Sequence, residues 1–140
     1  MTEFKRIDKD TLETMLNEIF EEQDEEHFGK VPEAEKEEIA IGLYIDNQLA
    51  GGIVGRKQYQ SLHISLLAIK KAFRGKSLGT QLLKEMERTA VEKNIINVTL
   101  TTRSYQAAGF YKKCGYTEYG SLKDMPIAGV TKIHFYKRMK

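Results

Sequence analysis

The hydrophobic positions of the chain change their period near residue 39. Before it, apolar side chains recur at intervals of three and four residues, at Leu12, Met15, Leu16, Ile19 and Phe20. This spacing places them on one side of a helix. The acidic stretch that follows, residues 21–38, contains a glycine and a proline, which predict a loop or a second short helix there.

From residue 39 the period falls to two, which is typical of strands. Large aliphatic residues alternate between Ile39 and Ile45, and the Asp46-Asn47 pair separates this run from residues 49–58. Two such runs joined by a two-residue turn predict a β-hairpin. The next run, residues 62–69, is mostly apolar, which predicts a central strand that is buried on both faces.

The second half of the chain continues with alternating helix and strand patterns. Residues 78–94 have the pattern of an amphipathic helix, residues 95–102 are rich in β-branched side chains, and residues 107–114 form a shorter helical pattern before Gly115. Two further strand patterns cover residues 116–121 and 131–138. A strand, a helix and a strand in succession imply a parallel crossover, so the pattern predicts an α/β fold.

Length and composition narrow the class of protein. The chain has 140 residues, 41% hydrophobic and 30% charged, as expected for one domain over residues 1–140 with its own core. No apolar run approaches the ~20 residues that cross a bilayer, and no leader pattern opens the chain, so we expect a cytoplasmic protein without a membrane partner. One cysteine, Cys114, and three histidines form no ligand cluster, so we expect no metal.

The charge is divided unevenly along the chain. Residues 1–60 carry 7 Lys/Arg and 15 Asp/Glu, whereas residues 61–140 carry 15 and 5, although the formal net charge is only +2. The basic half favours an anionic partner, either nucleic acid or a phosphorylated cofactor. Its lysines are spread over several predicted elements, without a recognition helix or interleaved aromatic residues, so we expect no nucleic acid.

The segment from Ile69 to Thr80 joins a predicted strand to the start of a predicted helix and contains Gly75 and Gly79. It also carries four basic residues, Lys70, Lys71, Arg74 and Lys76. Unpaired backbone N–H groups and the positive end of the helix dipole favour an anion at such a place. The spacing matches neither a Walker motif nor a dinucleotide fingerprint. Taken alone, the segment also fits an ordinary turn whose lysines are solvated.

Two motifs in this region resemble those of the GNAT superfamily of N-acetyltransferases. The sequence Arg74-Gly75-Lys76-Ser77-Leu78-Gly79 is similar to the family's Arg/Gln-x-x-Gly-x-Gly/Ala acetyl-CoA loop, and residues 104–116 are similar to its Asn-x-x-Ala-x-x-Phe-Tyr-x-x-x-Gly-Phe segment. The two motifs stand in the family's order, about 30 residues apart, and together are more specific than either alone. The resemblance implies a single-domain GNAT-like mixed sheet of about six to seven strands, flanked by about four helices.

The resemblance further implies acetyl-CoA as the cofactor, together with the residues that bind it. These are Leu67, Ala68, Ile69, Arg74, Gly75, Lys76, Ser77, Leu78, Gly79, Thr80, Ser104, Ala107, Phe110 and Tyr111. Two of them depart from the family pattern. Ser77 replaces a glycine, where it caps the helix, donates its hydroxyl to phosphate or weakens binding by straining the backbone. Ser104 replaces an asparagine, which puts one contact to the pantetheine arm in doubt.

The resemblance also assigns catalytic roles. Tyr111 matches the tyrosine that protonates the departing coenzyme A thiolate, and the backbone N–H near Leu67 would hold the thioester carbonyl. The acceptor amine must lose a proton, and His63 is the first candidate for the base, ahead of His27 and His134. On spacing alone, Tyr111 also fits core packing, and His63 also fits a strand histidine with no catalytic role.

We therefore expect an N-acetyltransferase that moves an acetyl group directly from acetyl-CoA to a primary amine of a small molecule or a peptide. The alternative is a protein of the same fold that senses acyl-CoA without turnover. The acidic stretch before residue 39 falls where family members place part of the acceptor site, which suits a cationic amine, although a solvated helix surface explains most of it. The resemblance also allows a homodimer.

Overall fold

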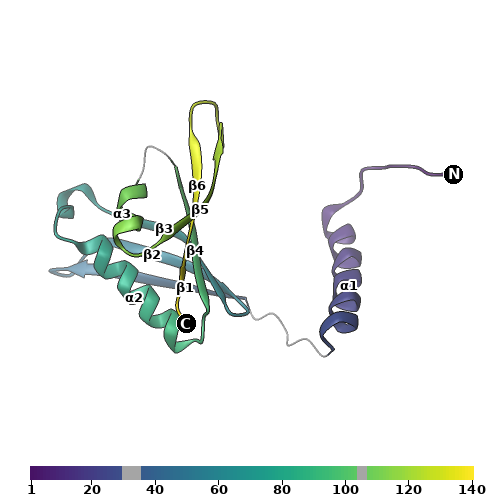
Figure 1. The fold of residues 1–140 in the computed structure, drawn as a ribbon, viewed down its shortest axis with the longest axis horizontal. Coiled ribbons are helices and arrows are strands. Elements are labelled where there is room, and N and C mark those ends of the chain that lie inside the picture. Colours follow the sequence, from purple (N-terminus) through teal and green to yellow (C-terminus); the bar gives the residue numbers. More distant parts are fainter. Residues whose placement is uncertain (30–35, 104–106) are drawn as a thin grey trace. The chain divides into compact units, whose positions relative to one another are not determined.

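The computed structural model describes residues 1–29, 36–103 and 107–140 of the chain (Figure 1). The chain divides into two compact units, residues 1–33 and residues 34–140. Helix α1, Lys9–Phe28, lies in the smaller unit, of which residues 1–29 are described. The larger unit contains a six-stranded sheet with two α-helices and one short 3-10 helix in its described residues. In the three described ranges, every helix is too short or too polar to cross a membrane.

Helix α1 begins and ends at residues that satisfy its terminal backbone groups. The Asp8 carboxylate accepts a hydrogen bond from the backbone N–H of Thr11 at 3.1 Å and another from its hydroxyl at 3.0 Å. Gly29, with a φ of 78°, donates its backbone N–H to the Glu25 carbonyl. The prediction that the helix gives way after Phe20 is wrong, because the glutamates that follow are good helix formers on an exposed helix surface.

The sheet is mixed, and the order of its strands in space differs from their order in the chain. Its strands are β1 Lys36–Ile45, β2 Gln48–Gln58, β3 Ser61–Ile69, β4 Asn97–Arg103, β5 Thr117–Lys123 and β6 Thr131–Arg138. They are arranged β1-β2-β3-β4-β6-β5. The β3–β4 pair is parallel, and helix α2, Leu78–Glu92, makes the predicted crossover between them. Helix α3, Ala108–Lys113, lies between β4 and β5 in the chain.

The predicted hairpin is confirmed as β1 and β2, with its turn at the expected place. Asp46 and Asn47 have φ values of 49° and 64°. Positive φ at two consecutive residues is typical of a type I′ turn, whose twist matches the twist of the strands it joins. Aspartate and asparagine tolerate this left-handed conformation better than other residues with a side chain.

One face of the sheet packs against α2 and α3 and carries the hydrophobic core, and we call it the helix face. Its central side chains, with those of the helices, are Ile53, Leu62, Ile64, Leu82, Leu83, Met86, Val98, Leu100, Tyr111 and Phe135. The expectation that β3 is buried on both faces is wrong. Leu66, which pairs with Val54 of β2, has its side chain on the opposite face, and the residue is 67% exposed.

Strands β3 and β4 diverge after a short stretch of pairing. Residues 61–64 of β3 pair with residues 97–100 of β4, and the pairing stops there. Ser65 follows as a bulge in β3, because Ile64 pairs with Gly55 of β2 and Leu66 with Val54. A bulge bends its strand, so β3 turns away from β4. The result is an opening at the carboxyl ends of two parallel strands, the place where open α/β sheets bind ligands.

The predicted α/β class is confirmed, and the six strands match the lower end of the expected count. The expectation of about four helices is met by three α-helices and the short 3-10 helix Lys71–Phe73 in the described parts of the chain. The sequence pattern predicts residues 71–73 only as part of a loop, whereas the structure has a 3-10 helix there.

Candidate active site

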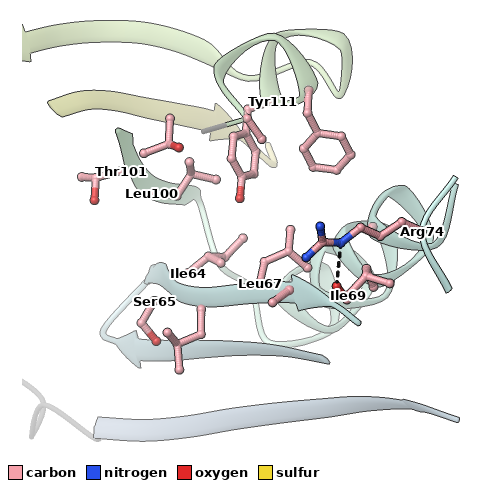
Figure 2. Close-up of a pocket in the computed structure, with 14 residues that line it drawn as sticks. Ile64, Ser65, Leu67, Ile69, Arg74, Leu100, Thr101 and Tyr111 are labelled. Atoms are coloured by element: carbon pink, nitrogen blue, oxygen red, sulfur yellow. Dashed lines mark hydrogen bonds between the residues drawn. The ribbon is translucent and has the colours of Figure 1, made fainter. Parts of the chain in front are cut away.

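The opening between β3 and β4 is a cavity of about 820 Å³, which we call the cleft (Figure 2). Its size is within the range of pockets that bind small molecules and cofactors. The cleft is lined by Ile64, Ser65, Leu66, Leu67, Ala68, Ile69, Arg74, Gly79, Leu100, Thr101, Thr102, Ala107, Phe110 and Tyr111. It therefore brings together residues of both diverging strands, of the loop before α2 and of α3. Eight of these residues belong to the predicted cofactor-binding set.

The edge of β3 directs backbone groups into the cleft. The Lys70 N–H donates to the Ala50 carbonyl at 2.8 Å, and backbone groups alternate sides along a strand. Those of Ile69 and Leu67 consequently face away from β2. In agreement, the Ile69 carbonyl accepts a hydrogen bond from Arg74 Nε at 3.0 Å within the cleft (Figure 2). The Leu67 N–H faces the same side of the strand, away from β2, and Leu67 is one of the residues that line the cleft.

The loop before α2 lines a second cavity of about 370 Å³ that adjoins the cleft. Ile69, Arg74, Gly79 and Phe110 line both cavities. The smaller cavity also gathers four predicted residues, Gly75, Ser77, Leu78 and Thr80. The first turn of α2 offers unpaired N–H groups and the positive end of its dipole here, so the cavity suits a phosphate group. Lys76 is exposed and lines neither cavity.

Tyr111 enters the cleft from α3. Its ring packs against Phe110, Tyr116 and Phe135 at centroid distances of 5.1, 6.0 and 6.0 Å, and the residue is 9% exposed. Figure 2 shows its hydroxyl pointing across the cleft toward β3. Burial, and after it the nearby Cys114, raises the pKa of Tyr111 above that of an ordinary tyrosine. The phenol is therefore protonated at pH 7 and can act as an acid.

His63 lies on the opposite face of the sheet and not among the residues that line the cleft. It alternates along β3 with the buried Leu62 and Ile64, and its Nδ1 lies 2.9 Å from Thr99 Oγ1. It lines a separate cavity of about 600 Å³ with charged residues of β1 and β2. Thr101, the next residue on that face of β4, does line the cleft. Thr99, which contacts His63, and Thr101 are two residues apart in β4 and therefore about 7 Å apart. His63 is thus separated from the cleft by about the distance between two such residues.

The surroundings of His63 suit a base. Burial, followed by the positive charges of Arg56 and Lys132 and by His134, lowers the pKa of His63. The imidazole is therefore neutral at pH 7 and can accept a proton. Of the weaker candidates, His27 lies on α1 in the smaller unit, and His134 pairs with Thr101 of β4.

The chain matches the model of the acetyltransferase (GNAT) family over residues 7–116. This range is more than half of the chain and contains both sequence motifs. The chain belongs to the GNAT family. The expected fold and the expected cofactor, acetyl-CoA, are those of this family.

GNAT proteins similar to this chain differ in the length over which they match. The chain is 40% identical to the blasticidin-S acetyltransferase of Streptomyces morookaense over 85 residues, 60% of this chain and 62% of that protein. An acetyltransferase of Bacillus cereus has a crystal structure with a TM-score of 0.81 and 30% identity, covering 98% of this chain and 97% of that one. An aminoglycoside 6′-N-acetyltransferase complexed with coenzyme A has a TM-score of 0.67 and 20% identity over 99% and 96%, a likeness of fold. The chain spans 49% to 62% of the length of the curated relatives it matches.

In this GNAT loop, Ser77 adopts a conformation that suits glycine better. Its φ of 58° and ψ of 25° are left-handed, and its side chain makes no capping hydrogen bond to α2. The suggestion that its hydroxyl caps the helix is therefore wrong, because a capping side chain normally requires extended backbone to reach the N–H groups of the first turn. A side chain in the left-handed region costs about 1 kcal/mol.

Ser77→Gly is expected to stabilise the protein by about 0.5–1 kcal/mol, which would raise Tm by about 3 °C. Glycine removes the clash of Cβ, although its freedom in the unfolded chain offsets part of the gain. Thermal unfolding measures the change. Ser77→Ala is the control, since it removes the hydroxyl and keeps Cβ. A similar rise in Ser77→Ala, or none in Ser77→Gly, would contradict the assignment of strain to this residue.

Several residues of the GNAT cleft were not predicted from the sequence. Ser65 and Leu66 of β3 and Leu100, Thr101 and Thr102 of β4 line it, but they belong to no motif. The feature that could have indicated them is the predicted parallel crossover, because it places the carboxyl ends of both strands beside one site. Ser104, which was predicted to contact the cofactor, lies outside the described residues.

Proposed function

We propose that this chain is an acetyl-CoA-dependent N-acetyltransferase that transfers the acetyl group directly to a primary amine of a small molecule. The observation that carries the proposal is the cleft between β3 and β4. The cleft adjoins the phosphate-type cavity before α2, contains the Tyr111 hydroxyl and is lined by Leu67, whose backbone N–H faces away from β2. An anion site, an acid and an oxyanion donor along one cavity are the groups that thioester chemistry requires.

Each end of acetyl-CoA has a matching place in this arrangement. The diphosphate would bind at the loop of residues 74–80, where Gly75 has a φ of 89° and leaves backbone N–H groups accessible. The pantetheine arm would lie along the edge of β3 that the divergence leaves unpaired. The thioester would then be near Leu67 and Tyr111, whose side chains both line the cleft.

The proposed reaction is a direct displacement at the thioester carbonyl. The neutral amine nitrogen forms a bond to the carbonyl carbon, and the carbonyl oxygen takes up negative charge beside the Leu67 N–H. The carbon–sulfur bond then breaks, and the thiolate of coenzyme A takes the proton of the Tyr111 hydroxyl, which solvent later restores. The proton lost by the amine passes through water to His63. The products are an amide and free coenzyme A.

Direct transfer is proposed in preference to an acetyl-cysteine intermediate. Cys114, the one cysteine of the chain, is half-buried. It lines a cavity between α2 and α3 and is not among the cleft residues. A small molecule is proposed as the acceptor because a relative 40% identical over 85 residues is a blasticidin-S acetyltransferase.

His63→Gln is expected to lower kcat/KM roughly 100-fold and to remove the acid limb of the pH profile. A base works in its deprotonated form, so the wild-type rate should rise with pH through the pKa of His63. Because that pKa is lowered, the rise should lie below its ordinary value of 6.5. His134→Gln is the matched control and should keep the limb. An acid limb that survives unchanged in His63→Gln would contradict the assignment.

The function as a whole is tested by binding and turnover together. Calorimetric titration with acetyl-CoA should give a saturable signal, and Arg74→Ala should weaken it because its guanidinium lies in the cleft. Release of free thiol over a panel of amines should then identify an acceptor. Binding without thiol release from any amine would favour the sensor alternative, and the absence of binding would contradict both.

A further inference from the structure

A network of polar groups joins α2, α3 and β6 behind Tyr111. Glu87 of α2 has a side chain that is 15% exposed. Its Oε1 accepts a hydrogen bond from Lys137 Nζ at 2.8 Å, and its Oε2 accepts one from the Tyr116 hydroxyl at 3.0 Å. Both carboxylate oxygens therefore have protein partners, and one of these bonds is an ion pair. A carboxylate with two protein partners holds the elements that carry these partners together, whereas a solvated surface charge does not.

The network holds the segment that carries Tyr111 at two points. Lys137 Nζ also donates to the Cys114 carbonyl at 3.0 Å, at the C-terminus of α3, where a cation suits the helix dipole. The Tyr116 N–H donates to the Tyr111 carbonyl at 3.0 Å, and the two rings meet edge to face at 6.0 Å. Gly115, with a φ of 91°, allows the chain to turn between these contacts.

Helix α3 depends on such contacts for its position. It has six residues, whereas an isolated helix is marginal below about 12–15 residues. Its N-cap residue, Ala107, provides no side-chain hydrogen bond to the first turn. The placement of a reacting group matters strongly, since an error of about 1 Å can lower a rate on the order of 100-fold.

We propose that Glu87, Lys137 and Tyr116 are positioning residues that hold the Tyr111 hydroxyl in place to protonate the departing thiolate. This inference rests on the proposed function, in which Tyr111 is the acid. The three residues are absent from the lining of the cleft, so they act through Tyr111 and not on the substrate. Burial and Glu87 raise the pKa of Tyr116, which keeps its hydroxyl protonated as a hydrogen-bond donor.

Tyr116→Phe is the central variant, because it keeps the ring and removes one hydroxyl. It should lower kcat about 10-fold and change KM for acetyl-CoA by less than about 2-fold, since the cleft itself is intact. In a Tyr111→Phe background it should have no further effect on kcat, because no hydroxyl remains to be placed. Glu85→Gln is the matched control. Glu85 is an exposed glutamate of the same helix that pairs with Arg88, and its loss should leave kcat unchanged.

A readout without turnover separates this inference from the proposed function. NMR titration of the protein with tyrosines labelled at Cζ reports the ionisation of Tyr111, whose signal Tyr111→Phe identifies. Tyr116→Phe and Glu87→Gln should lower the pKa of Tyr111, because a loosened α3 admits water and relieves the burial that raises it. Glu85→Gln should not. If Glu87→Gln fails to fold, Tyr116→Phe alone decides.

Three results would overturn the positioning role. They are an unchanged kcat in Tyr116→Phe, a full additional loss in the Tyr111→Phe background, and an unchanged Tyr111 titration in the variants. A shifted titration in a protein that acetylates no amine would support the network and count against the proposed function instead.

Discussion

Tyr111→Phe is expected to lower kcat roughly 100-fold, because the variant lacks the proton that the coenzyme A thiolate takes as it leaves. The variant keeps the ring that packs against Phe110, Tyr116 and Phe135, so the fold should be retained. Binding of acetyl-CoA should change by less than about 2-fold. The measurements are steady-state thiol release with an identified amine acceptor and a calorimetric titration with acetyl-CoA.

The pH profile gives this prediction a second readout. An acid works in its protonated form, and burial raises the pKa of Tyr111 above its ordinary value of 10.0. The wild-type kcat should therefore stay constant through neutral and mildly alkaline pH and decrease only above pH 10.0. Tyr111→Phe should not show this decrease at high pH. Tyr119→Phe is the matched control, since Tyr119 of β5 is 57% exposed. A kcat unchanged by Tyr111→Phe would remove the acid role.

Gly79→Trp is expected to abolish binding of acetyl-CoA, with a loss of at least roughly 100-fold in affinity. Gly79 lines both the cleft and the cavity before α2, so an indole at this position must occupy the space where the two meet. A Cβ added there would lie 3.4 Å from Cζ of Phe110, which is ordinary contact, so the fold should tolerate the substitution while the indole fills the space that the cofactor needs. Calorimetry with acetyl-CoA measures the loss.

Two further variants separate blockage of the site from general disruption. Gly79→Ala adds only the Cβ that the structure accommodates and should keep binding within about 3-fold. Gly120→Trp adds the same bulk on β5, where nothing lies within 4 Å of a new Cβ, and should bind acetyl-CoA normally. Normal binding by a folded Gly79→Trp would show that the cofactor does not use this cavity.

Local patterns in the sequence predict most elements of this fold. The alternation from Ile39 to Ile45, the Asp46-Asn47 turn and the amphipathic residues 78–94 each specify their own element, because burial of one face sets the period. Two of the predictions from local patterns are wrong. Leu66 is apolar and yet lies on the exposed side of β3, and the residues after Phe20 continue a helix that their charge alone does not reveal.

The candidate site was predictable where it depends on motifs and not where it depends on pairing between strands. Arg74, Gly79 and Tyr111 were assigned from the two motifs, and all three line the cleft. The place where β3 leaves β4 depends on a bulge at Ser65 and on the length of a parallel ladder. Neither leaves a pattern in one sequence, so Ser65 and Thr101 were missed.

Part of the positive charge in the second half of the sequence lies beside the candidate site in the larger unit. The basic segment of residues 70–76 leads into α2 and lies beside the cavity that suits a phosphate. Its charge is therefore best explained as attraction for an anionic cofactor. The partly buried Glu87 and its partner Lys137 cannot be recognised from the charge pattern, because a net charge does not distinguish solvated groups from a structural ion pair.

The most direct test of the account follows the acetyl group itself. Acetyl-CoA labelled with ¹³C at its carbonyl is mixed with the protein and a panel of small amines that includes blasticidin S, and the label is followed by NMR. We expect an amide signal on one of the amines with an equal amount of free coenzyme A thiol, and no signal with Gly79→Trp. Label that reaches no amine while acetyl-CoA binds, or label that accumulates on Cys114, would contradict it.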